Sequence, residues 1–199
     1  MSNSDLVRQG YDLIAGAYLA SRSRLKSGKY VQQLLKHLPK NSLILDLGCG
    51  AGVPVDDVVI KVGHEVIGLD ISSEQIKLAR KNCPRGDYVI GDICDLVMGE
   101  YQVGAVISFY TIFHSPRENH GKLLKILASY LKKGGMLLIT MGDREFEGMH
   151  DLHGSAMWSS QHGTHKNRNL VEQAGFSIIT DEMDNSGGER HQIIMAIKN

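Results

Sequence analysis

The sequence has no excess of charge of either sign, because its 199 residues include 22 basic and 22 acidic side chains. A protein that binds nucleic acid usually carries a basic surface, so this balance argues against a nucleic-acid partner and favours a small or neutral one. The basic residues Arg22, Arg24, Lys26 and Lys29 are better explained as a solvated helix face.

Long apolar runs and breaks in composition are lacking as well. No stretch approaches the roughly 20 apolar residues that cross a bilayer, and no charged segment followed by an apolar one opens the chain. We therefore expect no membrane partner and a cytoplasmic location. No repeat or shift in composition divides the chain, so residues 1–199 are expected to form one domain with a sizeable core.

Cysteine is scarce, and the three residues Cys49, Cys83 and Cys94 lack the spacing of metal ligands. Histidine is frequent only in the segment 142–165, where no H-x-x-x-H pattern or paired cysteine accompanies it. We therefore expect neither a metal site nor a cysteine nucleophile.

Glycine, in contrast, is concentrated at one point of the chain. The apolar run Leu43–Leu47 predicts a buried strand. Three glycines follow that allow the backbone to turn sharply and to approach a ligand closely, namely Gly48, Gly50 and Gly52. Residues Val53–Val62 then predict a helix with Pro54 in its first turn. A strand, a glycine turn and a helix start in this order predict a nucleotide-type site at the edge of a parallel sheet.

Two acidic residues bear on which nucleotide this site would take. Asp70 ends a second predicted strand, Glu65–Asp70, eighteen positions after Gly52, where a carboxylate can bind both ribose hydroxyls. That position suits a dinucleotide and S-adenosylmethionine equally. Asp46 precedes the first glycine, where it would meet a cationic amino group but would repel a pyrophosphate. We therefore favour S-adenosylmethionine, with an NAD(P)-dependent oxidoreductase as the alternative.

Four segments in this order resemble the class I S-adenosylmethionine-dependent methyltransferases. They are Leu-Asp-Leu-Gly-Cys-Gly-Ala-Gly from Leu45, Gly-Leu-Asp-Ile-Ser from Gly68, Gly91-Asp92, and Leu131 to Ile139. The resemblance runs from about Tyr11 to the carboxyl terminus. It implies an α/β fold with a doubly wound, Rossmann-like sheet of about seven strands, mostly parallel with an antiparallel C-terminal hairpin, and helices on both faces. It also implies S-adenosyl-L-homocysteine as the product.

The resemblance assigns cofactor contacts to particular positions. In the family an acid after the third strand accepts the adenine amino group and the next apolar residue packs on the ring, which implies these roles for Asp92 and Ile93. A capping role for Asp92 is the alternative. The full implied set is Tyr18, Asp46, Gly48, Gly50, Asp70, Ile71, Gln75, Asp92, Ile93 and Phe109. Tyr18, and with it Tyr11, would meet the methionine end, although both rings also fit the apolar face of an amphipathic helix.

The other elements follow from periodicity and from turn residues. Residues 1–38 predict two N-terminal helices over the cofactor site. Ser72 or Ser73 is expected to cap the helix that follows Asp70. The further predicted helices, these three included, are Ser4–Ala20, Gly28–Leu38, Glu74–Lys81, Pro116–Tyr130 and Lys166–Ala174. The further predicted strands are Asp87–Ile90, Val103–Tyr110, Met136–Met141, Gly175–Asp181 and Gln192–Ile197. The turn at residues 185–188 joins the last two strands.

The residues after the fourth strand face the reaction site in such a sheet. His114 is our first candidate for a general base, because neutral imidazole dominates near pH 7, and a packing or capping role is the alternative. Residues 142–165 show little periodicity and are expected to form an irregular lid over the methyl acceptor. Tyr110 and Trp158 are the predicted substrate-contacting residues of this region.

These features predict an enzyme that moves a methyl group from S-adenosylmethionine to a small molecule by in-line displacement. The chain lacks an Asn/Asp-Pro-Pro-Tyr/Phe element after the fourth strand, where Phe109-Tyr-Thr-Ile112 stands instead, and this argues against DNA amino or protein glutamine methylation. A non-catalytic S-adenosylmethionine-binding protein is a further alternative, because alignment of the reactants requires no signature base.

Overall fold

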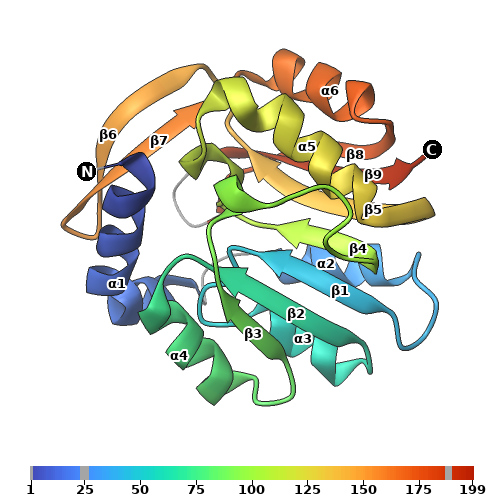
Figure 1. Ribbon diagram of the computed structural model, residues 1–199, viewed down its shortest axis with the longest axis horizontal. Coiled ribbons are helices and arrows are strands. Elements are labelled where there is room, and N and C mark those ends of the chain that lie inside the picture. Colours follow the sequence, from blue (N-terminus) through green and yellow to red (C-terminus); the bar gives the residue numbers. More distant parts are fainter. Residues whose placement is uncertain (1, 23–26, 187–189) are drawn as a thin grey trace.

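A seven-stranded sheet with the strand order β3-β2-β1-β4-β5-β9-β8 forms the centre of the computed structural model, which describes residues 2–22, 27–186 and 190–199 (Figure 1). The strands β1 to β5 pair in parallel, whereas β9 is antiparallel to both β5 and β8. The strands are β1 (Leu43–Leu47), β2 (Glu65–Asp70), β3 (Asp87–Ile90), β4 (Val103–Ser108), β5 (Leu131–Met141), β8 (Phe176–Asp184) and β9 (His191–Lys198). The α/β fold with an antiparallel C-terminal hairpin is thereby confirmed.

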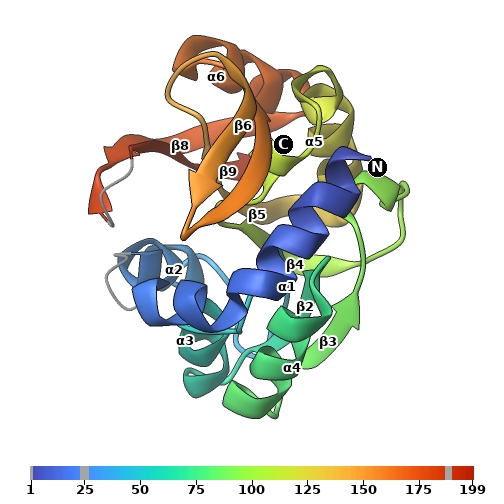
Figure 2. The same cartoon turned by 90° about the vertical axis from the view of Figure 1, so that its left-hand side faces the viewer.

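Helices cover both faces of this sheet, because neighbouring residues of each central strand point to opposite sides. Ile44 packs in a core with the helices α2, α3 and α4, whereas Leu45 packs in a second core with α5 and α6. The helices are α2 (Ser27–Leu35), α3 (Val55–Lys61), α4 (Ser73–Asn82), α5 (His120–Ser129) and α6 (Thr164–Gln173). The longest helix, α1 (Asn3–Arg22), crosses the carboxyl edge of the parallel strands (Figure 2).

Two predicted helix starts are wrong. The helix expected from Val53 begins at Val55, and Pro54 occupies its N-cap rather than its first turn. The helix expected from Pro116 is replaced by a 3-10 turn, η3 (Arg117–Asn119), before α5 begins. The reason is local: the Arg117 N–H donates to Ser160 Oγ at 3.0 Å, and the Arg117 carbonyl accepts from His162 Nε2 at 3.0 Å. The Arg117 carbonyl is thereby engaged by a side chain, whereas an α-helix would use it to accept the N–H four residues later.

The segment 142–165 is not the irregular lid that we expected. It forms an antiparallel hairpin of β6 (Phe146–Leu152) and β7 (Ser155–Gln161), which is a sheet of its own. Its two-residue turn consists of His153 and Gly154, both with positive φ (52° and 81°), as the tight hairpin turns require. β7 packs against α1, so the hairpin and α1 lie side by side over one end of the central sheet (Figures 1 and 2).

Other boundaries agree with the sequence to within a few residues, with α2 ending at Leu35 instead of Leu38 and β4 at Ser108 instead of Tyr110. Ser72, one of two predicted caps, accepts the N–H of Gln75 at the start of α4. β5 begins at Leu131, five residues before the prediction, because Leu131 pairs with Val103 beyond an irregularity in the register. Part of the basic cluster near Arg24 and part of the turn at 185–188 lie outside the described residues. Within the described ranges no helix has both the length and the apolar character needed to cross a membrane.

Candidate active site

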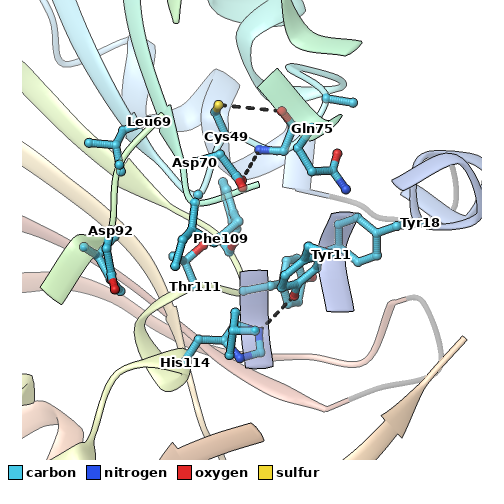
Figure 3. Close-up of a pocket in the computed structure, with 18 of the residues that line it drawn as sticks. Tyr11, Tyr18, Cys49, Leu69, Asp70, Gln75, Asp92, Phe109, Thr111 and His114 are labelled. Atoms are coloured by element: carbon cyan, nitrogen blue, oxygen red, sulfur yellow. Dashed lines mark hydrogen bonds between the residues drawn. The ribbon is translucent and has the colours of Figure 1, made fainter. Parts of the chain in front are cut away.

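A cavity opens where the carboxyl ends of β1, β2 and β4 meet α1 (Figure 3). Most of the predicted site residues lie on its wall. Those present are Tyr18, Gly48, Gly50, Asp70, Ile71, Gln75, Asp92, Ile93, Phe109, Tyr110 and His114. Residues that the prediction did not include also line the wall: Ser4, Val7, Leu19, Cys49, Ala51, Val53, Leu69, Gly91 and Thr111.

The glycine turn after β1 forms the floor of this cavity. The backbone at Gly48, Gly50 and Gly52 has φ of 73°, 55° and 75°, a conformation that L side chains rarely adopt. A Cβ at Gly48 would lie 1.8 Å from Oγ1 of Thr111, so no larger residue fits there. At Gly50 the nearest atom, Oε1 of Gln75, lies 3.7 Å from such a Cβ, which leaves the backbone open to a ligand.

Asp70 connects this turn to the end of β2. One carboxylate oxygen accepts the N–H of Gly50 at 2.9 Å, and the other accepts the N–H of Ser72 at the same distance. Each carboxylate oxygen can accept a further hydrogen bond, so the group can hold the turn and still bind hydroxyls in the cavity. Asp70 therefore has a structural role that the sequence did not indicate.

Gln75 carries a buried amide without a partner. Gln75 is fully buried in α4, and neither its Oε1 nor its Nε2 forms a hydrogen bond within the described structure. An unsatisfied buried polar group costs roughly 1–3 kcal/mol of stability. Because this amide lies on the cavity wall, a polar ligand in the cavity would supply the missing partners.

Asp92 has the capping role that was one of its two interpretations. Its carboxylate accepts the N–H of Cys94 at 2.8 Å and caps the 3-10 turn η1 (Ile93–Asp95). The residue also lines the cavity together with Ile71 and Ile93, so capping does not remove it from the site.

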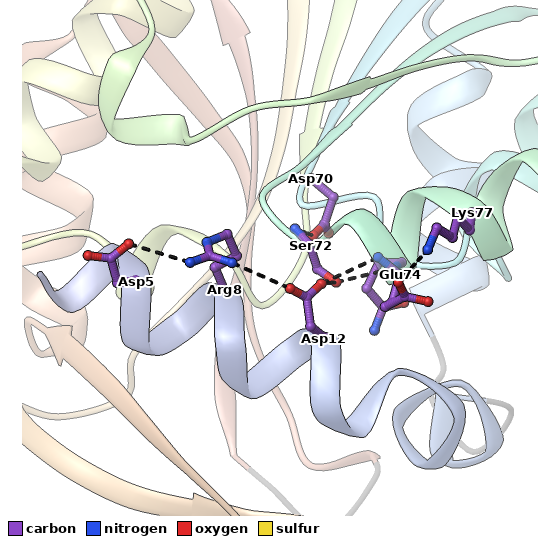
Figure 4. A network of polar contacts seen from close by, with 8 residues as sticks. Asp5, Arg8, Asp12, Asp70, Ser72, Glu74 and Lys77 are labelled. Atoms are coloured by element: carbon purple, nitrogen blue, oxygen red, sulfur yellow. Dashed lines mark hydrogen bonds and ion pairs between the residues drawn. The ribbon is translucent and has the colours of Figure 1, made fainter. Parts of the chain in front are cut away.

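Helix α1 closes one side of the cavity and is tied to α4 (Figure 4). Oδ1 of Asp12 accepts the hydroxyl of Ser72 at 2.6 Å and the N–H of Glu74 at 3.3 Å. Nη1 of Arg8 lies 3.7 Å from Oδ2 of Asp12, so the two side chains form an ion pair on the surface of α1. Asp12 thus adds a second acceptor at the amino end of α4, where negative charge is favourable.

The rings of Tyr11 and His114 meet at the end of the cavity opposite Gln75 (Figure 3). η2 (Ile112–His114) follows β4, and the Nδ1–H of His114 donates to the carbonyl of Trp158 at 2.8 Å. This bond leaves Nε2 as the acceptor for the Tyr11 hydroxyl, 2.9 Å away. Burial lowers the pKa of His114 to about 4, so the imidazole is neutral at pH 7 and accepts a proton only weakly.

Tyr110 is held in an unusual conformation beside this pair. Its φ of 58° lies in the left-handed region, which is rare for a bulky residue and costs of order 1 kcal/mol or more. The N–H of Tyr110 donates to Oγ1 of Thr140 at 2.5 Å, and its ring meets His191 edge to face at 4.9 Å. The backbone strain fixes the direction of an aromatic ring on the cavity wall.

Two predicted site residues do not line the cavity. Asp46 is buried beneath the glycine turn and lies against Asp56, whose pKa is raised first by burial and then by the charge of Asp46. Tyr88 donates its hydroxyl to Asp56 at 3.0 Å. Asp46 therefore lies close to Asp56 of α3, and its contact with the cationic amino group of the cofactor stays a prediction. The backbone carbonyl of Trp158 accepts from His114, and the predicted contact of the Trp158 ring with the methyl acceptor stays a prediction.

Comparisons with known proteins agree with this geometry. Residues 44–135 match a family model described as a methyltransferase domain. A probable S-adenosylmethionine-dependent methyltransferase of Mycolicibacterium smegmatis is 26% identical over 74% of this chain and 57% of that protein. A tRNA (carboxymethyluridine(34)-5-O)-methyltransferase of Arabidopsis thaliana is 32% identical over 71% of this chain and 33% of that protein. The magnesium protoporphyrin IX methyltransferase of Synechocystis has a similar fold, with a TM-score of 0.77, 18% identity and coverage of 100% and 98%.

By its fold, the order of its motifs and these matches, the chain belongs to the class I S-adenosylmethionine-dependent methyltransferase superfamily. The dinucleotide alternative is thereby set aside. The chain spans about half the length of the curated relatives that it matches, for example 57% of the mycobacterial protein. The cofactor of the superfamily is S-adenosylmethionine, and the open turn at Gly50 and the unpartnered amide of Gln75 fit a polar ligand of this kind.

Proposed function

We propose that this protein transfers a methyl group from S-adenosylmethionine to a small-molecule acceptor. The observation that carries the proposal is a single cavity that joins the cofactor motifs to a reaction end made of neutral hydrogen-bonding side chains. Asp70 and Gln75 stand on one part of its wall, and Tyr11 and His114 stand on another.

The cofactor would lie along the first part. Asp70 would accept the ribose hydroxyls with the lone pairs that Gly50 and Ser72 leave available. Ile71 and Ile93 would pack on the adenine ring, with the Asp92 carboxylate next to them as an acceptor for its amino group. The unpartnered amide of Gln75 would form hydrogen bonds with polar groups of the cofactor.

S-adenosylmethionine, when bound, supplies a methyl group on a positively charged sulfur, which is the difficult part of the chemistry. The protein's own contribution is alignment and the exclusion of water. Tyr11 donates its hydroxyl proton to Nε2 of His114, and its phenolic oxygen would accept an N–H or O–H from the methyl acceptor. His114, whose Nε2 accepts from Tyr11 and whose pKa burial lowers to about 4, would orient Tyr11, and its role as a general base stays a prediction.

Two observations favour a small acceptor. The reaction end is covered by α1, and β7 packs on that helix, so an acceptor must enter a confined space. The chain also carries 22 basic and 22 acidic residues and lacks the positive excess that binding to a nucleic acid favours.

The test is to incubate the purified protein with cofactor labelled on its methyl group and with separate RNA, protein and small-metabolite fractions. We expect label in the metabolite fraction, with stoichiometric release of S-adenosylhomocysteine. Label confined to RNA or to protein would contradict the small-molecule assignment but would leave methyl transfer intact. Cofactor binding without transfer to any fraction would favour a non-catalytic binding protein.

A further inference from the structure

The reaction end of the cavity is built from uncharged aromatic side chains. Tyr11 meets His114 edge to face, with ring centroids 5.4 Å apart and an interplanar angle of 87°. Phe109 and Tyr110 follow one another on the wall, with ring centroids 6.2 Å apart. Among the described lining residues, Asp70 and Asp92 alone carry charge, and both belong to the cofactor part.

The direction of these rings is fixed before any ligand binds. Tyr110 is held at a positive φ by Thr140 and packs on His191, which in turn stacks on Phe113 at 5.4 Å with an interplanar angle of 21°. Tyr11 is oriented by its bond to His114, and His114 by its bond to the Trp158 carbonyl. A wall of preset ring faces and edges complements a flat π-system better than a puckered ring of the same size.

We propose that the methyl acceptor is an uncharged, flat aromatic or heteroaromatic ring that bears an N–H or O–H next to Tyr11. The inference rests on the proposed function and specifies its substrate class. The ring would stack between the aromatic side chains of the wall, and its N–H or O–H would donate to the Tyr11 oxygen. In the transfer the acceptor's nitrogen or oxygen forms a bond to the methyl carbon, the carbon–sulfur bond breaks with its electron pair left on sulfur, and the acceptor's proton goes to water.

The wall also argues against charged acceptors. No described cationic side chain lines the reaction end, so a carboxylate or phosphate on the acceptor would lose its hydration without a partner. His114 cannot act as that partner, because Nδ1–H already donates to Trp158 and Nε2 accepts from Tyr11.

The test uses protein saturated with S-adenosylhomocysteine and measures binding by calorimetry, so that it does not depend on turnover. The three probes are naphthol, its saturated counterpart decalol, and hydroxynaphthoate, which adds one carboxylate. We expect naphthol to bind at least about tenfold more tightly than either of the others. Equal affinity for decalol, a preference for hydroxynaphthoate, or no binding of naphthol would overturn the proposal.

Two variants test whether residues of the cavity wall cause the preference for naphthol. Tyr110→Leu should reduce the preference for naphthol over decalol, whereas Tyr11→Phe should keep it but reduce the preference for naphthol over methoxynaphthalene, which lacks the hydroxyl proton. Phe146→Leu, at a partly exposed ring on β6 outside the cavity, is the matched control and should change neither. A separate titration of the ligand-free protein with S-adenosylhomocysteine shows that each variant is folded. A wild-type protein that does not bind S-adenosylhomocysteine would contradict the cofactor assignment, and both proposals with it.

Discussion

The side-chain amide of Gln75 illustrates how a site residue can be distinguished from a core residue. A fully buried glutamine normally has hydrogen-bond partners for its amide, because a buried amide without partners costs free energy equal to a large share of a domain's stability. Here both polar atoms lack a partner and lie on the wall of the cavity. We interpret this cost as one that the bound cofactor removes.

Replacing this amide should therefore have opposite effects on stability and on binding. We expect Gln75→Met, which keeps the length of the side chain, to raise the free energy of unfolding of the cofactor-free protein by about 1–3 kcal/mol. The same change should weaken binding of S-adenosylhomocysteine. Denaturant unfolding and calorimetry measure the two effects, and Gln32→Met on the exposed side of α2 is the control. A variant that binds the cofactor as tightly as the original would show that Gln75 does not contact it.

Asp70 should differ from Gln75 because it serves both the fold and the ligand. We expect Asp70→Ala to weaken cofactor binding by roughly 1–3 kcal/mol through the loss of charge-assisted hydrogen bonds. It should also lower the free energy of unfolding, since Gly50 and Ser72 lose the carboxylate that accepts their N–H groups. Calorimetry and denaturant unfolding again measure both, with exposed Asp87→Ala as the control. Unchanged affinity would refute the ribose assignment.

At this scale the sequence predicted residues that belong to local patterns and missed those that depend on packing. Asp70 and the glycines of the turn could be predicted because a strand end and a glycine spacing place them directly. The bond between the Trp158 carbonyl and His114 could not be predicted, because any residue type provides a backbone carbonyl. The direction of the Asp46 side chain depends on the position of α3, which the spacing of residues does not give.

At the scale of elements, α1 packs against β7 and is joined near its middle by side-chain hydrogen bonds to the start of α4 and to η2. Asp12 bonds to Ser72 and Glu74 of α4, and the neighbouring Tyr11 bonds to His114. The two residues are adjacent in the helix but contact different elements, so α1 bridges the cofactor part and the reaction end of the cavity. Figure 4 shows the contacts of Asp12.

Loss of the first attachment should loosen this helix alone. We expect Asp12→Ala to increase amide hydrogen exchange in α1 and to speed dissociation of S-adenosylhomocysteine, while exchange in the central strands stays unchanged. Asp5→Ala is the contrasting variant, because Asp5 bonds to Ser2 at the start of α1 and makes none of the contacts to α4. It should affect only the first turn of the helix. Equal exchange in α1 of Asp12→Ala and the original protein would argue against the attachment.

The β6–β7 hairpin is the element that sequence reasoning missed. Tight two-residue hairpin turns favour Asn-Gly or Asp-Gly, and here His153 takes the first position at a φ of 52°, so the turn lacks the residue pair that would indicate it in the sequence. Alternation of polar and apolar residues is also weak in β6, whose side chains are mostly exposed or half-buried. The hairpin is stabilised by its contacts with α1 and with η2, and such contacts have no signature in the sequence.

At the scale of the whole molecule, the arrangement of strands and helices was predictable because the pattern is strong. Continuous apolar strands alternate with amphipathic helices, and this alternation favours a parallel sheet covered on both faces. The two cores on opposite faces of the sheet follow from the alternating direction of side chains in β1 and β4. The details that were missed lie at the edge of the sheet, where the site is.

Two buried histidines make the stability of the fold dependent on pH. Burial lowers the pKa of His114 and of His120 to about 4, below the ordinary 6.5. Between pH 4 and pH 6.5 these two histidines therefore bind a proton in the unfolded chain but not in the folded protein. The stability is fully present above pH 6.5 and falls as the pH decreases toward 4.

His120 offers a test of this dependence away from the reaction end. Each such histidine adds a slope of up to about 1.4 kcal/mol per pH unit in this window. We expect His120→Gln to reduce the slope of the unfolding free energy between about pH 6 and pH 5 by up to this amount. Exposed His37→Gln should leave the slope unchanged. Denaturant unfolding at several pH values gives the slope, and equal slopes for all three proteins would contradict the account.

The central claim is that the cavity at the glycine turn binds S-adenosylmethionine. Its most direct test is a calorimetric titration of the purified protein with S-adenosylmethionine, S-adenosylhomocysteine and NAD. We expect micromolar, one-to-one binding of the first two and no heat from NAD, because Asp70, Gln75 and the open turn at Gly50 suit a sulfonium nucleoside without a pyrophosphate. Binding of NAD without binding of S-adenosylhomocysteine would contradict the account.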